Sequence, residues 1–187
     1  MKSLFVVIAL AILTSAIVPA HAADHADKVS RGQYLVTVAG CNDCHTPLKM
    51  GPNGPERDMS RMLSGHPEFL AITAPPPAPT QQPWLITIAG TGTAYSGPWG
   101  VSFTANLTPD AETGIGKWSL RNFKDTIRSG RHLGRGREIL PPMPIPQYKH
   151  FTDEDLEAVF AYLQSIPAIH NRVPEPLPPV VPVAAVP

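Results

Sequence analysis

The first half of the chain contains one stretch with a helical pattern, residues 27–39. Its apolar side chains recur at the spacing of an amphipathic helix with one buried face, and they are Val29, Leu35, Val36 and Val38. Gly40 follows directly and is expected to end the helix. Gly32 lies inside it, where glycine costs about 1 kcal/mol relative to alanine. We therefore expect Gly32 to be a position of close packing against another element.

Two further helices are expected in the second half of the chain. Ser119 can cap the first of them, and Gly130 suits the left-handed residue that ends it. The apolar positions between these two residues recur at intervals of three and four: Leu120, Phe123 and Ile127. The second helix begins after Thr152, which forms a capping-box pattern with Asp155, and it ends before Pro167. Its apolar stripe is the clearest in the chain: Leu156, Val159, Phe160 and Leu163.

Between these helices the pattern of apolar and polar residues is irregular. No helical period persists over residues 46–108, and the prolines within residues 75–83 predict a stiff extended segment, since proline fixes φ and lacks an N–H donor. A weak alternation over residues 84–88, followed by several glycines, indicates a short hairpin. From Pro174 onward six of 14 residues are proline, which predicts an extended and flexible tail.

Length and charge restrict the class of protein. The 187 residues suit a single domain. Lys plus Arg and Asp plus Glu both number 15, and charged residues make up only 16% of the chain. Such a balance provides no strongly basic face, so nucleic acid is not an expected partner.

The N-terminus has the pattern of an export signal. Lys2 precedes an apolar run over residues 4–13, and Ala20-His21-Ala22 has the small-x-small pattern of a signal-peptidase site. The alternative is an uncleaved anchor, but residues 4–18 are shorter than the roughly 20 apolar residues of a spanning helix. The expected organisation is a cleaved signal peptide, a folded domain and a flexible tail, over residues 1–22, 23–173 and 174–187. The mature protein is expected to be soluble and periplasmic, without a transmembrane anchor.

Both cysteines lie in one short motif. Cys41 and Cys44 enclose two residues and His45 follows at once, which gives the C-x-x-C-H signature of c-type haem attachment. Two thiols at this spacing can add to the vinyl groups on one edge of a porphyrin, and the adjacent imidazole then reaches one face of the iron. A disulfide would close a very small loop, a zinc site lacks a second ligand pair, and a thioredoxin-like pair needs a strand-helix-strand setting. We therefore expect one covalently attached haem c, with His45 on its iron.

The second axial ligand separates electron carriers from catalysts and gas binders. Met143 is the favoured candidate and lies in the run Pro141-Pro142-Met143-Pro144. The fixed φ angles of the three prolines restrict the backbone, so less entropy is lost when the Met143 thioether is held at the iron. Met59 and Met62 lie in an irregular polar stretch and remain alternatives. Two histidines compete for the same position: His132 and His150.

Together these features resemble a small monohaem c-type cytochrome, with the attachment motif near the N-terminus and a methionine ligand near the C-terminus. The similarity covers most of the mature chain and is carried by residues 32–38, 127–131, 140–144, 152–156 and 161–163. Asn106-Leu107-Thr108-Pro109-Asp110, with the glycine-containing segment that follows, is also similar to cytochrome modules of subunits that serve periplasmic alcohol, sugar-acid and aldehyde dehydrogenases. The resemblance implies thioether attachment through Cys41 and Cys44. It also implies axial ligation by His45 and Met143 and packing of the first helix across the last.

The expected fold is mostly α, a cytochrome c fold with three to four helices around one haem and with long irregular loops. The expected function is the transfer of single electrons between redox partners by an exported haem protein. Such a protein is an electron carrier and not an enzyme, and no catalytic residue is expected. Its expected partners are a periplasmic dehydrogenase and a terminal oxidase or another cytochrome. It would act as a free carrier or as the electron-transfer subunit of a dehydrogenase complex. The alternative is a peroxidase-like or gas-binding haem module, which requires a displaceable sixth ligand.

Overall fold

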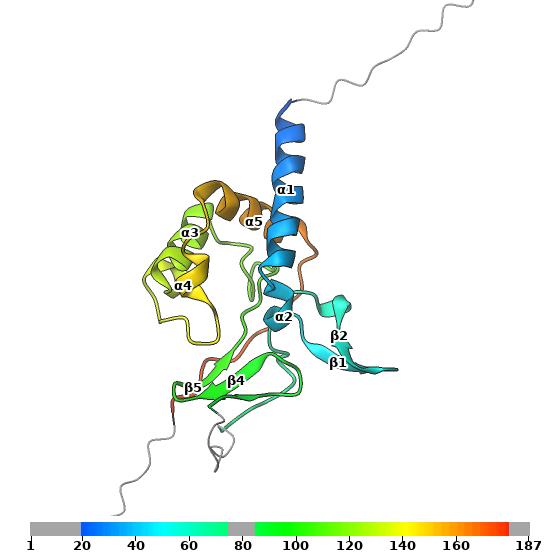
Figure 1. Cartoon of the computed structure of the whole chain (residues 1–187), viewed down its shortest axis with the longest axis vertical. Helices are drawn as coiled ribbons and strands as arrows, with labels where there is room; N and C mark the ends of the chain where they lie inside the picture. Colours follow the sequence, from blue (N-terminus) through cyan, green and yellow to red (C-terminus); the bar gives the residue numbers. More distant parts are fainter. Residues whose placement is uncertain (1–19, 75–84, 180–187) are drawn as a thin grey trace, which may run out of the picture.

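The computed structural model describes residues 20–74 and 85–179, with side chains from Asp24 onward. Most of the expected signal peptide, the proline-rich segment and the end of the tail lie outside the described residues. Within this range lie the helices α1 (Ala20–Val38), α2 (Cys41–His45), α3 (Leu120–Ser129), α4 (Ile145–Tyr148) and α5 (Asp153–Ser165), as Figure 1 shows. No helix in this part of the chain combines the length and the apolar character that crossing a membrane requires.

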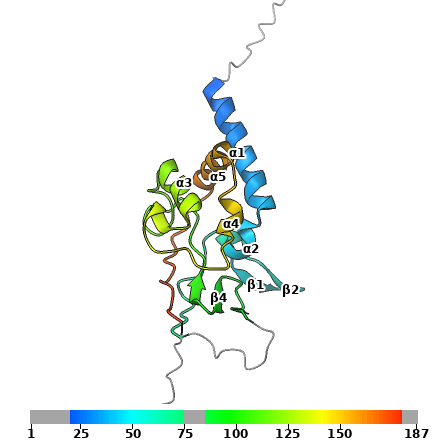
Figure 2. The same ribbon diagram turned by 60° about the vertical axis from the view of Figure 1, so that its left-hand side comes forward.

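Helices α1 and α5 cross closely, and Gly32 makes the close approach possible. A Cβ atom at Gly32 would lie 1.9 Å from the carbonyl oxygen of Ala158 in α5, so no larger residue fits. The two helices lie side by side in both Figure 1 and Figure 2. The predicted packing role of Gly32 and the predicted packing of the first helix across the last are confirmed.

The ends of α3 and α5 follow the local signals in the sequence. The hydroxyl of Ser119 accepts a hydrogen bond from the backbone N–H of Asn122 at 3.1 Å, and the Asn122 side chain accepts one from the N–H of Ser119 at 3.2 Å. Gly130 ends α3 with a φ of 68°, the left-handed conformation that glycine adopts without strain. Thr152 accepts a hydrogen bond from the N–H of Asp155 at 3.0 Å and caps α5. The three predicted helices are therefore present.

A main apolar core joins α1, α3 and α5. Its buried members on these helices are Leu35, Val36, Phe123, Ile127, Leu156, Ala158, Val159 and Leu163. A smaller apolar cluster lies at the other end of the molecule and contains Ala94, Val101 and Phe103. The helices thus pack at one end, and the smaller cluster belongs to a sheet at the other end (Figure 1).

Two small antiparallel sheets occupy the region without a helical pattern. Strands β1 (Leu48–Gly51) and β2 (Gly54–Arg57) form a hairpin that projects from the body in Figure 1. Strands β3 (Thr87–Ile88), β4 (Ala94–Gly97) and β5 (Gly100–Phe103) form the second sheet, where the sequence indicated a short hairpin. The expectation of a mostly α fold with three to four helices is thus only partly met. Strands of two to four residues are too short to give a readable alternation, and this is why the first hairpin was not predicted.

The described part of the proline-rich tail packs on the second sheet. The N–H of Val101 in β5 donates to the carbonyl of Leu177 at 2.9 Å, and the N–H of Leu177 donates to the carbonyl of Val101 at 3.0 Å. The segment is extended, as its prolines predict. Over its described residues, however, it is attached to β5 and is not a free tail. The folded domain therefore continues beyond the boundary that the sequence placed at Pro174.

Candidate functional site

Helix α2 places Cys41, Cys44 and His45 on one turn directly after α1. Gly40 joins the two helices with a φ of 70°, a conformation that favours glycine. No disulfide joins the two cysteines, and burial raises the pKa of the Cys41 thiol to about 11. All three side chains border the same cavity. The motif therefore presents two thiols and an imidazole to one space.

The ring of His45 is buried and oriented by a backbone carbonyl. Its Nδ1 lies 2.8 Å from the carbonyl oxygen of Ala105. The tautomer that donates this hydrogen bond leaves Nε2 available as a metal ligand. Burial lowers the pKa of His45, and the hydrogen bond to Ala105 only partly opposes this. The neutral imidazole that burial favours is the form that binds a metal ion.

Polar side chains hold the segment that carries the Ala105 carbonyl. The Oδ1 atom of Asn106 accepts hydrogen bonds from the N–H and the hydroxyl of Thr108, at 3.0 and 2.7 Å. Its Nδ2 donates to the carbonyl of Ile169 at 2.8 Å. The motif over residues 106–110 thus connects the carbonyl that orients His45 to the C-terminal segment.

Met143 lies on the wall of the same cavity, in the loop between α3 and α4. The cavity has a volume of about 330 Å³ and a largely apolar wall, as is usual for cofactor sites. The structure therefore brings all four predicted site residues to one cavity: Cys41, Cys44, His45 and Met143.

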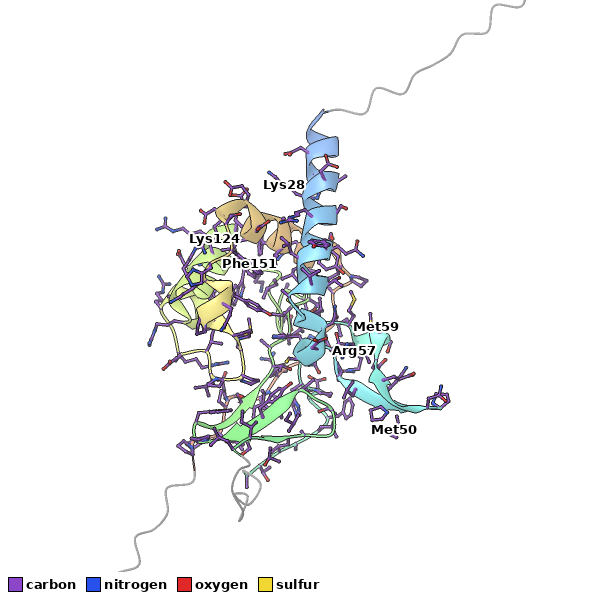
Figure 3. All side chains as sticks on the ribbon, in the orientation of Figure 1. Lys28, Met50, Arg57, Met59, Lys124 and Phe151 are labelled. Carbon is purple, nitrogen blue, oxygen red and sulfur yellow. The ribbon has the colours of Figure 1, made fainter. Side chains whose placement is uncertain are left out.

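The other methionines within the described residues lie elsewhere. Met50 and Met59 are 77% and 57% exposed, and Figure 3 shows them on the side of the β1–β2 hairpin. Met62 packs against the main apolar core. None of the three borders the cavity, so the alternative ligands Met59 and Met62 are not brought to the motif.

One of the competing histidines does reach the cavity. His132 borders it and meets the ring of Trp118 edge-on, with the ring centres 5.2 Å apart. Burial lowers the pKa of His132. His150 is exposed and does not border the cavity. His66 is fully buried and has both ring nitrogens hydrogen-bonded within the protein. Among the histidines, His132 is thus the competitor of Met143.

Asn171 joins the C-terminal segment to residues 61–68 beside the cavity, although nothing in the sequence indicated it. It is fully buried. Its Nδ2 donates to the carbonyls of Ser64 and His66, both at 2.8 Å. Its Oδ1 accepts from the guanidinium of Arg61 at 2.8 Å and from the N–H of Glu68 at 3.0 Å. These four partners satisfy the amide completely, and all of them lie more than 100 residues earlier in the chain.

The groups that border the cavity fit a haem c. Its attachment uses two thiols, and its iron takes nitrogen and sulfur ligands such as an imidazole and a thioether. The cavity offers the thiols of Cys41 and Cys44, the free Nε2 of His45 and the thioether of Met143 within a largely apolar wall. The residues present therefore match the chemistry that the sequence motif predicts.

The known proteins to which this chain is similar include cytochrome subunits of dehydrogenases. The chain is 29% identical to the fructose dehydrogenase cytochrome subunit of Gluconobacter japonicus over 147 residues, which are 79% of this chain and 23% of that protein. It is 27% identical to the cytochrome c subunit of the quinone-dependent alcohol dehydrogenase of Gluconobacter oxydans over 161 residues, 83% of this chain and 26% of that protein. It is 31% identical to the gluconate 2-dehydrogenase cytochrome c subunit of Pantoea cypripedii over 134 residues, 72% of this chain and 22% of that protein.

The chain therefore spans about a quarter of the length of these relatives. No family model matches it. All three relatives are named as cytochrome subunits of dehydrogenases. These similarities support a c-type cytochrome module.

Proposed function

We propose that this protein binds one haem c and transfers single electrons between redox partners. Cys41 and Cys44 form the thioether bonds, and His45 and Met143 hold the iron. The observation that carries the proposal is the meeting of these four side chains at one cavity, although Met143 comes from a loop far along the chain. When bound, the haem supplies a ferric/ferrous couple that takes up and releases one electron.

Each proposed ligand has a defined task. The carbonyl of Ala105 accepts a hydrogen bond from the Nδ1–H of His45, which would leave Nε2 free to hold the iron. The thioether of Met143 stabilises the reduced form and so raises the midpoint potential. A side chain in the sixth position also excludes oxygen and peroxide. The Met143 loop therefore favours electron transfer over a peroxidase-like or gas-binding role.

The proposal extends to location and partners. Residues 1–22 direct export and are removed, and the domain works in the periplasm. A dehydrogenase supplies the electrons, and a terminal oxidase or another cytochrome accepts them. The similarity to cytochrome subunits of fructose, alcohol and gluconate dehydrogenases supports a dehydrogenase as the donor. The protein acts as a free carrier or as the electron-transfer subunit of such a complex.

The covalent attachment can be tested by mass. After expression with the haem-maturation machinery, the intact protein should exceed the mass of residues 23–187 by one haem, and its pyridine haemochrome should report two saturated vinyl groups. Replacement of Cys41 and Cys44 by serine should abolish the attachment. A bare polypeptide from the parent protein, or full haem retention in the double serine variant, would contradict the proposal.

The axial ligand can be tested by spectroscopy. Met143→Ala should retain the haem but lose the sulfur-to-iron charge-transfer band of the ferric protein, and its midpoint potential should fall. Met59→Ala is the matched control and should retain both properties, because Met59 is exposed and does not border the cavity. If the band survives in Met143→Ala, or if the parent protein lacks the band and His132→Ala changes its spectrum, the ligand has been assigned to the wrong residue.

A further inference from the structure

The loop that carries Met143 has few hydrogen bonds to hold it. Three of the five residues 140–144 are prolines, which have no N–H to donate. The carbonyl of Pro141 accepts a hydrogen bond from the hydroxyl of Ser102 at 2.5 Å. Within the part of the chain that the structure describes, residues 140–143 have one further hydrogen bond to another element, from the N–H of Ile145 at the start of α4 to the carbonyl of Met143. The Ser102 hydroxyl is therefore the polar attachment of the Met143 loop to the second sheet.

Ser102 is itself held firmly. It lies in β5, which pairs with β4 on one side and with Leu177 on the other. Its side chain is only 7% exposed and borders the cavity. The carbonyl of Tyr95 is a second acceptor for the hydroxyl, but at 3.4 Å it is much farther than Pro141. The single hydroxyl proton is thus directed to the Met143 loop.

The packing on the other side of the loop is apolar. Met143 and Ile145 lie against the main core, and the N–H of Ile145 donates to the carbonyl of Met143 at 2.9 Å. Apolar contact restrains a side chain without fixing one direction, whereas a hydrogen bond depends on both distance and angle. The bond from Ser102 adds this directional restraint two residues before Met143.

We propose that Ser102 is a positioning residue that holds the thioether of Met143 in place through the Pro141 carbonyl. This inference rests on the proposed function, because it concerns how firmly the sixth iron position is closed. Loss of the bond frees the loop, so that an added ligand displaces the thioether more easily. The second sheet, which carries Ser102, thereby controls access to the iron.

The test is cyanide binding to the ferric holoprotein. Ser102→Ala should raise the affinity for cyanide about tenfold, the factor that corresponds to the loss of one intramolecular hydrogen bond, and should weaken the sulfur-to-iron charge-transfer band. Ser96→Ala is the matched control on the neighbouring strand β4, where the serine hydroxyl makes no hydrogen bond within the described residues. This control should leave both signals unchanged.

A second pair of variants distinguishes the effect of the hydroxyl from that of side-chain packing. Ser102→Thr retains the hydroxyl donor. Ser102→Val places a side chain of nearly the same shape as threonine there, but without a hydroxyl. We expect the threonine variant to bind cyanide like the parent and the valine variant to bind it about tenfold more tightly. Equal affinities in these two variants would overturn the inference, whatever happens to Ser102→Ala.

A double-mutant cycle shows whether Ser102 acts through Met143. In the Met143→Ala background there is no thioether to hold, so Ser102→Ala should then leave the cyanide affinity unchanged. An unchanged tenfold effect in that background would mean that Ser102 acts directly on the cavity, and it would overturn the positioning role. The failure of the proposed function has a different signature, because the parent protein would then lack the haem or the charge-transfer band.

Discussion

The helical part of this molecule and its irregular part are stabilised in different ways. Helices α1, α3 and α5 share an apolar core in which Leu156 and Leu163 are almost completely buried. The segments around the two sheets have a smaller apolar cluster. There the fully buried side chains include Asn171, Thr93 and His66, which are polar and hydrogen-bonded. Apolar burial tolerates some adjustment, whereas a buried polar group that loses its partner is costly.

The two parts also contribute differently to the cavity. The end of α1 leads directly into Cys41, Cys44 and His45, so the helical part places the residues of the attachment motif. The irregular part supplies the Ala105 carbonyl and the hydrogen bond from Ser102, which orient side chains. Damage to the helical part should therefore unfold the protein. Milder damage to the irregular part should leave a folded protein with altered spectra.

The largest effect is expected at the helix crossing. Gly32→Val should destabilise the protein by roughly 3 to 5 kcal/mol, because the added side chain meets a backbone carbonyl that cannot move aside. Urea unfolding followed by circular dichroism measures this loss. Gly90→Ala is the matched control, since a Cβ atom there meets nothing within 4 Å. Similar losses in both variants would mean that the crossing is looser than the structure shows.

A smaller but still severe effect is expected at Asn171. Asn171→Ala leaves two carbonyls, one N–H and a guanidinium without their partner, and the expected loss is about 2 to 3 kcal/mol. Far-ultraviolet circular dichroism of the folded variant should still show the helices, while amide exchange should accelerate around Ser64 and His66. Asn53→Ala, in the exposed turn of the first hairpin, serves as the control. Slow exchange in the Asn171 variant would show that the polar network is dispensable.

The same contrast explains what could be predicted from the sequence. The caps at Ser119 and Thr152 and the C-x-x-C-H motif are local, because the residues that interact are close in sequence. Met143 could be proposed because its flanking prolines are a local signal too. The role of Ala105 could not be predicted, because any residue provides a backbone carbonyl. Nor could that of Asn171, whose partners lie more than 100 residues away.

A pH-dependent effect is expected from His66. Burial lowers the pKa of this side chain, whereas the unfolded chain has the ordinary value of about 6.5. Below pH 6.5 the unfolded state therefore takes up a proton that the folded state does not, and stability falls as the pH decreases. Between pH 6.5 and 5.5 this costs at most about 1.4 kcal/mol.

The measurement is urea unfolding of the parent protein and of His66→Gln at pH 7.5 and 5.5. The parent should lose more stability than the variant between the two pH values. His150→Gln removes an exposed histidine and serves as the control for the loss of one histidine. Identical pH dependence in the parent and in His66→Gln would show that His66 titrates normally in the folded protein.

The smallest effect is expected from the ion pairs that join α3 to α5. Lys124, labelled in Figure 3, lies 3.2 Å from a carboxylate oxygen of Asp153, and Arg128 lies 2.7 Å from the other. Both cations, Arg128 first, lower the pKa of Asp153. The pairs therefore stabilise the fold above the ordinary carboxyl pKa, and this contribution disappears as the pH falls below about 4. The Asp153 side chain is 61% exposed, so solvent and salt screen the interaction.

Asp153→Asn should accordingly lower the urea midpoint slightly at pH 7 and low salt. The difference from the parent should vanish at pH 3 and again in 1 M salt, where the Debye length shrinks to about 3 Å. Asp27→Asn removes an acid on α1 that forms no ion pair within the described residues, and it should shift the midpoint less. A large loss for Asp153→Asn that persists in high salt would mean that polar pairing, and not only the apolar core, holds the helical part together. The distinction between the two parts of the molecule would then have to be abandoned.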